Sequence, residues 1–262
     1  MELLDQDARR GLLGFLKAHG AGVEPLAVCA GTNPGWVFAN DGARPSTALV
    51  WSKGNYGFYL TGKVPGGLGP LIRECLIPRL KAHGIGAFEI SCVDPSEDAA
   101  LLGALGAFDV DAWKQMIFRF DGLRSPPQAE HGRVLPIQAA LQEEILQNAG
   151  FVHTQLLEYW ESLDSFDRAG MGFCAIEDGQ AVSLCFTGWA AGDVRALSIE
   201  TLEAYRRRGH GERCAAALVW SCLERGLTPH WECESTNAAS WRLAEKIGFL
   251  PDREYICYGF RL

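Results

Sequence analysis

The sequence has no apolar stretch long enough to cross a membrane. The longest uninterrupted one lies within residues 214–223, far short of the roughly 20 residues that a membrane-spanning helix needs. The first residues, MELLDQD, carry acid where a secretory signal peptide carries base, and no apolar core with a small-residue cleavage site follows them. We therefore expect a cytoplasmic protein without a membrane partner.

Positive charge is in deficit. The 262 residues include 24 Lys and Arg against 32 Asp and Glu, which gives a formal net charge of -8. Nucleic-acid binding depends on a surplus of Lys and Arg, so we expect no nucleic-acid partner. With 48% hydrophobic and 21% charged residues, the composition is typical of a globular protein with a substantial core.

Paired cysteines are missing as well. The nine cysteines are odd in number, include no C-x-x-C pair, and mostly stand in apolar runs such as SLCF at residues 183–186. This pattern predicts buried free thiols in a reducing compartment. It indicates neither a disulfide framework nor a zinc site, and we expect no metal.

Local patterns predict strands and helices in mixed order along the first half. Apolar spacing indicates an amphipathic first helix, and turn-forming Asn-Asp-Gly and Lys-Gly-Asn segments separate short strands. The expected elements are a helix at 5–18, strands at 36–38, 47–51 and 56–60, a Gly-rich loop at 66–69 leading into a helix to about 82, a strand at 87–93, a short helix after 94–97 and a strand at 114–120.

A segment rich in turn formers marks the predicted domain boundary. We expect an N-terminal α/β domain over residues 1–121, a linker over 122–132 and a second domain over 133–262. The elements expected in the second domain are a strand at 133–137, helical stretches at 138–147 and onward to about 166, a hairpin of 172–176 with 181–186, a strand at 194–201, a helix to about 225, a strand at 230–234, a helix at 238–247 and a strand at 255–260.

The two halves share an order of elements at a fixed offset. Three glycines of the first half, Gly67, Gly69 and Gly84, stand 142 residues before Gly209, Gly211 and Gly226. In each half, a predicted strand is therefore followed by a G-x-G segment, a helix and a glycine at the end of that helix. An internal structural duplication explains this order. The alternative is a coincidence between unrelated α+β domains.

The densest basic segment, YRRRGHGER at residues 205–213, lies between a predicted strand and a predicted helix. Backbone N–H groups at a helix start lack partners and lie at the positive end of the helix dipole, so they bind anions. Glycines allow close approach of a ligand to that backbone, and arginines add charged donors. The segment predicts a pyrophosphate site; the alternative is an ordinary glycine turn with solvated arginines.

This segment resembles the R/Q-x-x-G-x-G/A pyrophosphate loop of the GNAT family of acyl-CoA N-acyltransferases, with Arg206, Gly209 and Gly211 at the defining positions. Downstream, Asn237, Ser240 and the run EKIGF at 245–249 resemble the family's next helix. The resemblance implies an α+β fold with a mixed sheet: a GNAT fold in the C-terminal half and a degenerate GNAT-like N-terminal half.

A subgroup typified by the zwittermicin A resistance protein, in which an extra domain precedes the acetyltransferase domain, is more similar still. The segments behind this are GFCAIEDG at 172–179, IET at 199–201, PHWEC at 229–233 and SWRLAEK at 240–246. The resemblance implies an antibiotic-resistance-like acetyltransferase with acetyl-CoA as co-substrate.

The same resemblance implies the cofactor contacts. The strand backbone from Ile199 to Thr201 would run along the pantetheine arm, and Asn237 and Ser240 would contact the cofactor from the next helix. Asn237 could equally serve only as the cap of that helix. The residues implied to hold the pyrophosphate are Arg206, Arg207, Arg208, Gly209, His210, Gly211 and Glu212.

The activity that the family implies is N-acetylation of a primary amine on a small molecule, by direct attack in a ternary complex. Such a reaction needs an oxyanion donor, expected among the backbone N–H groups of residues 199–201, and a proton acceptor. Glu200 is the first choice for this base and Glu232 the second, with Glu234 and His230 behind them. Alternatively, Glu200 points to the opposite face of its strand and is solvated or structural.

One position departs from the family pattern. Ala244 precedes EKIGF where the family often has a Tyr that protonates the leaving thiolate. The candidates that remain are Tyr205, Tyr255 and Tyr258, and spacing does not choose among them. Cys233 is either a buried thiol of its strand or, alternatively, a nucleophile that accepts the acyl group.

The first half lacks the charged loop. At the offset of 142, Val64 and Pro65 replace Arg206 and Arg207, which removes one charged donor and one backbone N–H. We therefore expect the first half not to bind CoA, and to shape the acceptor pocket or complete the sheet packing.

Two other functions remain open. The missing acid at Ala244 favours a non-catalytic CoA-binding or regulatory protein, and a protein or peptide N-acetyltransferase is the third hypothesis. The net charge of -8 favours a cationic small-molecule amine as acceptor. Both a monomer and a homodimer are compatible with the sequence.

Overall fold

The computed structural model describes residues 1–42, 44–124, 133–142 and 146–262. The chain forms two compact units. Unit 1 comprises Met1–Gln115 and Glu254–Leu262, and unit 2 comprises Met116–Arg253. Within the described residues, no helix is both long enough and apolar enough to cross a bilayer.

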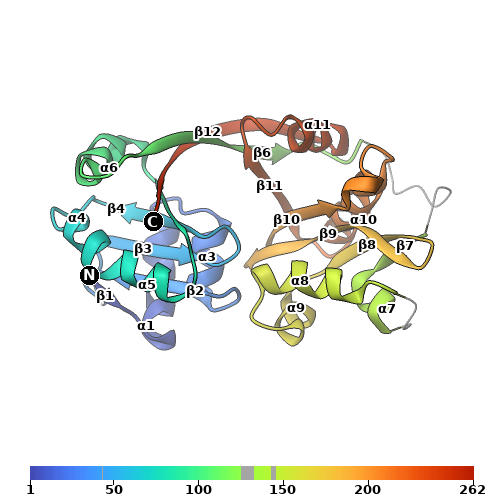
Figure 1. Ribbon diagram of the computed structural model, residues 1–262, viewed down its shortest axis with the longest axis horizontal. Helices are drawn as coiled ribbons and strands as arrows, with labels where there is room; N and C mark the ends of the chain where they lie inside the picture. The colour runs from blue at the N-terminus through green and yellow to red at the C-terminus, as the bar shows by residue number, and fades with distance from the viewer. Residues whose placement is uncertain (43, 125–132, 143–145) are drawn as a thin grey trace. The chain divides into compact units, whose positions relative to one another are not determined.

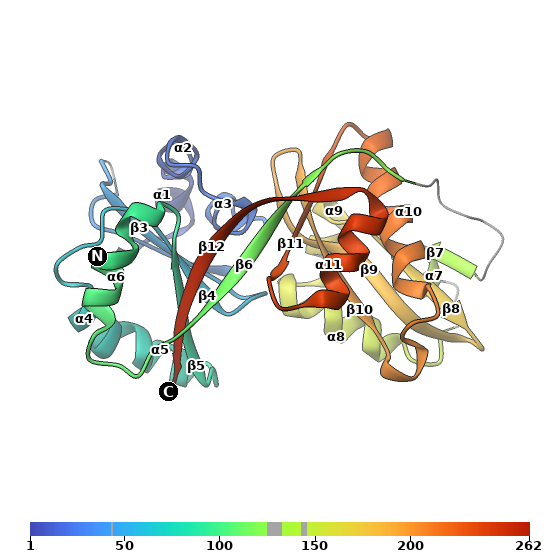
Figure 2. The same ribbon diagram turned by 90° about the horizontal axis from the view of Figure 1, so that it is seen from above.

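Unit 1 is a sheet covered by helices on both faces (Figures 1 and 2). Its strand order is β1-β2-β3-β4-β5-β12. Its elements are β1 (Glu2–Leu3), α1 (Gln6–Gly11), α2 (Leu13–Ala18), α3 (Val23–Ala30), β2 (Gly35–Ala39), β3 (Thr47–Ser52), β4 (Gly57–Gly62), α4 (Leu68–Leu71), the π-helical η1 (Ile72–Leu76), α5 (Ile77–Ala82), β5 (Ala87–Cys92), η2 (Pro95–Glu97), α6 (Asp98–Leu105), and parts of β6 (Asp111–Phe120) and β12 (Phe249–Arg261).

Alternation along the strands builds two cores in unit 1. On β3, Leu49 and Trp51 pack with α4–α6, whereas Ala48 and Val50 pack with α2 and α3. All six residues of β3 are buried because helices cover both of its faces. Such a strand has a continuous apolar sequence rather than an alternating one.

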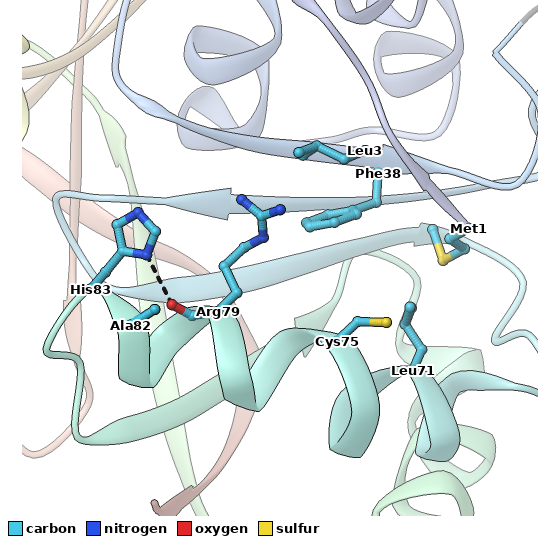
Figure 3. Close-up of a pocket in the computed structure, with 8 residues that line it drawn as sticks. All are labelled: Met1, Leu3, Phe38, Leu71, Cys75, Arg79, Ala82 and His83. Atoms are coloured by element: carbon cyan, nitrogen blue, oxygen red, sulfur yellow. Dashed lines mark hydrogen bonds between the residues drawn. The ribbon is translucent and has the colours of Figure 1, made fainter.

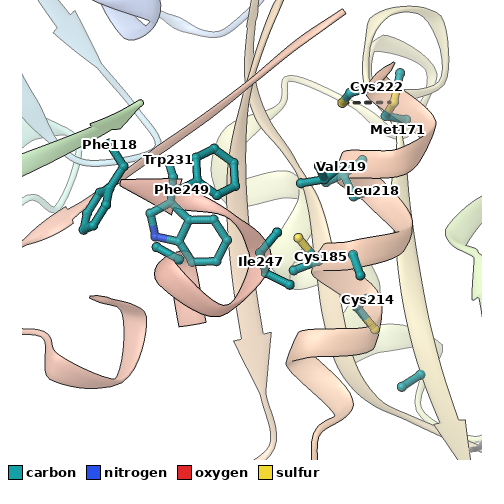
Figure 4. Close-up of a cluster of buried hydrophobic side chains, with 14 of the residues drawn as sticks. Phe118, Met171, Cys185, Cys214, Leu218, Val219, Cys222, Trp231, Ile247 and Phe249 are labelled. Atoms are coloured by element: carbon teal, nitrogen blue, oxygen red, sulfur yellow. Dashed lines mark hydrogen bonds between the residues drawn. The ribbon is translucent and has the colours of Figure 1, made fainter. Parts of the chain in front are cut away.

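Unit 2 has the same layered plan, with α10 and α11 on one face and α7–α9 on the other. Figure 4 shows the core under α10, where Cys214, Leu218 and Val219 lie near Cys185 of β9. Its further elements are β7 (Arg133–Pro136), α7 (Ile137–Gln142), α8 (Ala149–Tyr159), α9 (Leu163–Ala169), β8 (Gly172–Glu177), β9 (Gln180–Ala191), β10 (Val194–Thr201), η3 (Glu203–Tyr205), α10 (His210–Glu224), β11 (Thr228–Glu234) and α11 (Ala238–Ile247).

The two units have one topology, which confirms the predicted duplication. Strands β1-β2-β3-β4-β5 and β7-β8-β9-β10-β11 follow the same order, antiparallel except for the last pair. That last pair is parallel in both: β4 with β5, and β10 with β11. Gly67 and Gly209 are the N-cap residues of the equivalent helices α4 and α10.

The repeats exchange their final strands. By the offset of 142 residues β12 is the counterpart of β6, yet β12 pairs with β5 of the first repeat, from Cys257 opposite Ser91 to Arg261 opposite Ala87. In unit 2, β6 is the neighbour of β11. Each sheet is therefore completed by a strand from the other repeat.

This exchange makes the observed division differ from the predicted one. The units divide within β6 and β12, at Gln115/Met116 and Arg253/Glu254, rather than at 122–132. Most of the predicted linker, residues 125–132, lies outside the described residues. The difference arises because the partner of a terminal strand depends on tertiary pairing, which local turn signals do not encode.

Most predicted elements are confirmed. Strand β1 was not predicted, and the helix expected over 138–147 is described as helix only to Gln142, with residues 143–145 outside the described residues. The helix expected over 5–18 is divided at Leu12 into α1 and α2, and α3 was not predicted. Helix α3 buries Val23, Ala27, Val28 and Cys29 and lacks a polar stripe that would mark a helical period.

The cysteines are free thiols, as predicted, and Cys75 alone among the nine is exposed. Burial raises the pKa of Cys214 to about 12 and that of Cys222 to about 11. These thiols therefore remain protonated at neutral pH and act as small apolar side chains of the core.

The strand exchange predicts that residues 254–262 stabilise unit 1. A chain ending at Arg253 should lose amide-exchange protection in β5, whose partner is removed, while β8 and β9 of unit 2 remain protected. Hydrogen exchange with mass spectrometry measures both regions in one experiment. Full protection of residues 87–92 in the shortened chain would contradict the exchange.

Candidate active site

Strands β10 and β11 separate part-way along their length. Their parallel ladder has three pairs, from Val194 opposite Thr228 to Ala196 opposite His230. β10 continues to Thr201 and β11 to Glu234, while β10 stays paired with β9 throughout. A register shift at Ala196/Leu197 coincides with the separation, and such bulges bend strands. We call this divergence the β10–β11 split.

The loop after β10 turns the chain into α10 with two left-handed residues. Arg207 has φ +64° and Gly209 has φ +79°, a region that glycine adopts without steric cost. Gly211 serves a different purpose: a Cβ there would lie 3.4 Å from Oγ1 of Thr201 and 3.7 Å from Cγ2 of Ile199. These are ordinary contact distances, so the start of α10 packs against β10 here and only a side chain larger than that of Ala would crowd Thr201 and Ile199.

The backbone N–H groups of this loop are available to a ligand. Within the described residues, no acceptor takes a hydrogen bond from the N–H groups of residues 207–212, whereas the N–H of Arg213 donates to the carbonyl of Gly209. Helix α10 has 15 residues, so its dipole adds positive potential at this end. The loop therefore has the donors that an oxyanion needs.

The three arginines of the loop have different surroundings. Arg206 donates to the carbonyl of Thr201 (3.1 Å) and to Glu200 (3.3 Å). Arg208 pairs with Glu177 at 3.3 Å and lies over the ring of Tyr205. Arg207 is exposed, and no ion pair of the described residues includes it. Glu212, at the start of α10, forms an ion pair with Lys246.

His210 is a structural link at the start of α10. Its Nδ1 lies 2.8 Å from a guanidinium nitrogen of Arg213, and its Nε2 lies 3.1 Å from Glu177. Because Arg213 can only donate, Nδ1 accepts and the ring proton resides on Nε2. Burial, and then the charge of Arg213, lower the pKa of His210. Its side chain is engaged, so only its backbone N–H is free for a phosphate.

Sequence reasoning missed Glu177 and Arg213 as members of this site. Glu177 ends β8 and contacts two residues of the loop, Arg208 and His210. The turn after β8 was predicted, but nothing in the sequence links Glu177 to a loop 31 residues later. Arg213 stood in the basic segment, where its spacing of three from His210 was the available signal.

The two candidate bases differ in their surroundings. Ile199 and Thr201 face α10, so Glu200 faces the opposite side of β10. Its Oε1 accepts from the N–H of Thr201 and from Arg206. This is the structural role foreseen as the alternative for Glu200: the carboxylate positions an arginine of the loop.

Glu232 forms a close pair with His230 at the β10–β11 split. The two side chains are 16% and 19% exposed, and Oε2 of Glu232 lies 3.6 Å from Nε2 of His230. Trp231 and Cys233 pack into the core with α10 and α11, so His230 and Glu232 face the other side of the sheet. His230 ends the parallel ladder, which puts the pair where the strands diverge. Glu234, the other carboxylate, bonds Thr236.

The start of α11 holds the two remaining predicted cofactor contacts. The side chain of Asn237 accepts from the N–H of Ser240 at 3.1 Å and caps α11. The hydroxyl of Ser240 accepts from Nε1 of Trp231 at 3.1 Å. Both side chains therefore have structural partners at the start of α11. This helix follows β11, which is the neighbour of β10 in the sheet.

The structure reduces the number of candidate residues for the general acid and for a nucleophile. Ala244 is fully buried, and of the three tyrosines only Tyr205 belongs to unit 2. Burial raises the pKa of the Cys233 thiol, which disfavours the thiolate that a nucleophile needs.

Comparison with known proteins decides the family. The sequence profile named GNAT acetyltransferase matches residues 126–258, about half of the chain. The chain belongs to this GNAT family. An uncharacterized N-acetyltransferase of Bacillus subtilis (strain 168), YdfB, is 32% identical over 119 residues, which cover 45% of this chain and 46% of that protein. The match therefore spans about half the length of the curated relative.

Solved GNAT structures are similar over both units. A GCN5-related N-acetyltransferase-like protein from Streptococcus suis 89/1591 has a TM-score of 0.65 at 20% identity, over 97% of this chain and 99% of that one. A tandem GNAT protein from the clavulanic acid biosynthesis pathway has a TM-score of 0.58 at 12% identity, over 99% and 97%. At these identities the similarity shows the GNAT fold.

In unit 1, the strands that correspond to the split stay together. The parallel ladder of β4 with β5 reaches Leu60 opposite Cys92, the last residue of β5. Beyond it, the N–H of Val93 still donates to the carbonyl of Leu60 at 2.8 Å. The first GNAT repeat therefore has no counterpart of the β10–β11 split between these strands.

In unit 1, a carboxylate of the protein binds the backbone just before the loop that corresponds to residues 207–212. The carboxylate of Glu97 accepts from the N–H of Val64 at 3.0 Å and from Lys63 at 2.6 Å, and the bond from Lys63 lowers the pKa of Glu97. Pro65 and Pro70 have no N–H to offer. Glu97 thus binds the position equivalent to Arg206, and prolines at 65 and 70 remove two of the N–H groups that the loop of unit 2 has.

The neutral His210 predicts a pH dependence of stability. Its folded pKa lies below the ordinary 6.5, so unfolding takes up a proton, and stability present at higher pH falls as pH drops through about 6.5. We expect the unfolding free energy of the native protein to fall more steeply from pH 7 to pH 5 than that of His210→Gln, by up to about 1.4 kcal/mol per pH unit. Denaturant titrations at each pH measure it. Parallel curves for the two proteins, or the same flattening in a His153→Gln control, would refute this role.

Proposed function

We propose that this GNAT protein is an acetyl-CoA-dependent N-acetyltransferase that acetylates a primary amine of a small molecule by direct attack in a ternary complex. One observation carries the proposal: the β10–β11 split leads to the unpaired N–H groups at the start of α10. That arrangement fits a ligand with an extended polar arm and a pyrophosphate.

The donors of unit 2 fit acetyl-CoA. Thr201 uses its N–H and carbonyl within the chain, so the backbone of Ile199, which β11 leaves unpaired, would bond the pantetheine arm. The N–H groups of residues 207–212 would hold the pyrophosphate with Arg206, Arg207 and Arg208. When bound, acetyl-CoA supplies the thioester that an amine attacks. Asn237 and Ser240 would border the same ligand from α11.

The His230–Glu232 pair is the proton acceptor that the geometry favours. A neutral imidazole takes the proton of the attacking amine, and the carboxylate 3.6 Å away stabilises the imidazolium that forms. The pair is mostly shielded from water, which strengthens this interaction. Glu200, bound to Arg206, orients the loop instead.

The remaining groups complete the reaction without a tyrosine at position 244. The N–H of Thr201 already donates to Glu200, so the backbone N–H of Ile199 would stabilise the oxyanion on the thioester carbonyl. A thiolate leaving group has a pKa near 8.5, so it departs at neutral pH without an obligatory acid. The acidic chain attracts a cationic amine, in line with the resemblance to an antibiotic-resistance subgroup.

The cofactor assignment predicts one acetyl-CoA per chain, bound at unit 2. In calorimetric titration, Arg206→Ala should weaken binding about 10-fold through loss of a charged donor, and Gly211→Trp should abolish it by filling the contact with Thr201. The control is Arg225→Ala, an exposed arginine at the other end of α10. Binding of two equivalents, or equal affinity in all variants, would refute the assignment.

The base assignment predicts that Glu232 and Glu200 affect different kinetic parameters. Glu232→Gln should lower kcat about 100-fold or more and shift the acidic limb of the pH–rate profile to lower pH, because the imidazolium of His230 loses its neighbouring carboxylate. Glu200→Gln should keep that limb and mainly raise the KM for acetyl-CoA, because it releases Arg206. The measurement is thiol release over a panel of small amines. If no amine releases thiol above solvent hydrolysis, the non-catalytic alternative replaces the enzyme.

A further inference from the structure

Unit 1 contains a pocket of about 520 Å³, on the face of its sheet that carries α4 and α5. Figure 3 shows it between this helical run, which provides Leu71, Cys75 and Arg79, and the edge strands, which provide Leu3 and Phe38. Its volume lies within the range of roughly 300–1,000 Å³ found for small-molecule sites. It belongs to the repeat that lacks the cofactor donors, so it is separate from the proposed acetyl-CoA site.

The helical wall of the pocket has an irregular turn. The π-helical η1 (Ile72–Leu76) joins α4 to α5, and the N–H of Ile77 donates to the carbonyl of Ile72. Pro78 follows and has no N–H for a regular helical bond, which accounts for the wider turn. Cys75, in this turn, faces the pocket. Such turns are frequent at functional sites.

Arg79 places a positive charge against an aromatic wall. Its guanidinium carbon lies 5.3 Å from the centre of the Trp36 ring and 6.0 Å from that of Phe38. The Trp36 ring is held by stacking on Trp51 at 4.0 Å. Among the described residues, no carboxylate forms an ion pair with Arg79. The pocket thus combines apolar walls with one cation that lacks a counter-ion.

We propose that this pocket binds a small amphiphilic carboxylate. The carboxylate bonds the guanidinium of Arg79, whose planar fork matches two oxygens. The apolar body lies along Phe38, Leu71 and Met1, where it removes apolar surface from water. An uncharged molecule of the same shape gains the apolar contacts without the charged bond and binds more weakly.

Cys75 provides a local readout of occupancy. It is the exposed thiol among the nine cysteines and lines this pocket. A ligand seated against η1 slows alkylation of Cys75 by iodoacetamide. Alkylation of the peptide that contains residue 75, followed by mass spectrometry, separates this site from any binding to unit 2.

The test compares octanoate with octanol as probes on the native protein and two variants. We expect octanoate to slow alkylation of Cys75 at concentrations about 10-fold lower than octanol does, and Arg79→Met to lose that advantage. Lys81→Met removes an exposed charge from the same helix and keeps it. Saturating CoA leaves the protection unchanged.

Two results overturn the proposal. One is equal protection by octanoate and octanol, or by neither, on the native protein, which needs no variant and is independent of folding defects. The other is undiminished octanoate protection in Arg79→Met, with circular dichroism confirming that both variants fold. Loss of acetyl-CoA binding in unit 2 leaves this readout unaffected, so the two proposals fail separately.

Discussion

The length of one parallel strand pairing decides what each half of this protein can do. In unit 2 the ladder of β10 with β11 ends at Ala196 and His230, and the unpaired strand ends run on. In unit 1 the ladder of β4 with β5 continues to the last residue of β5. A backbone already paired within the sheet has no donors or acceptors to offer a ligand. The site that we propose for acetyl-CoA therefore lies at the split of unit 2.

Because of the exchanged strands, the stability of each repeat depends on a strand of the other. β12 is encoded by the second repeat and stabilises β5 of the first, while β6 is the neighbour of β11. Tyr258, on the exchanged end of β12, is buried in the core of unit 1. Removing the last strand of the first repeat would therefore leave β11 of the second repeat without its neighbour.

The sequence predicted those features that local chemistry determines. The turn at Asp178-Gly179 and a helix after the glycine loop, expected to begin near Glu212 and found to begin at His210, follow from glycine chemistry and charge within a few residues. The offset of 142 residues predicted a duplication that the topology confirms. The pairs Glu177–His210 and β12–β5 join segments far apart in the chain, and no local pattern reports them. Helix α3 was missed because a nearly all-buried helix has no amphipathic period.

The two related loops, before α4 and before α10, depend differently on a free anion, because Glu97 binds the backbone of the first. In unit 1 the anion is tethered to the chain, so its effective concentration is fixed and high. In unit 2 the equivalent donors wait for a free anion, whose stabilisation grows only with the logarithm of its concentration. The donor at Val64 is therefore satisfied at every ligand concentration, whereas an anion bound at the start of α10 would stabilise unit 2 only as its concentration allows.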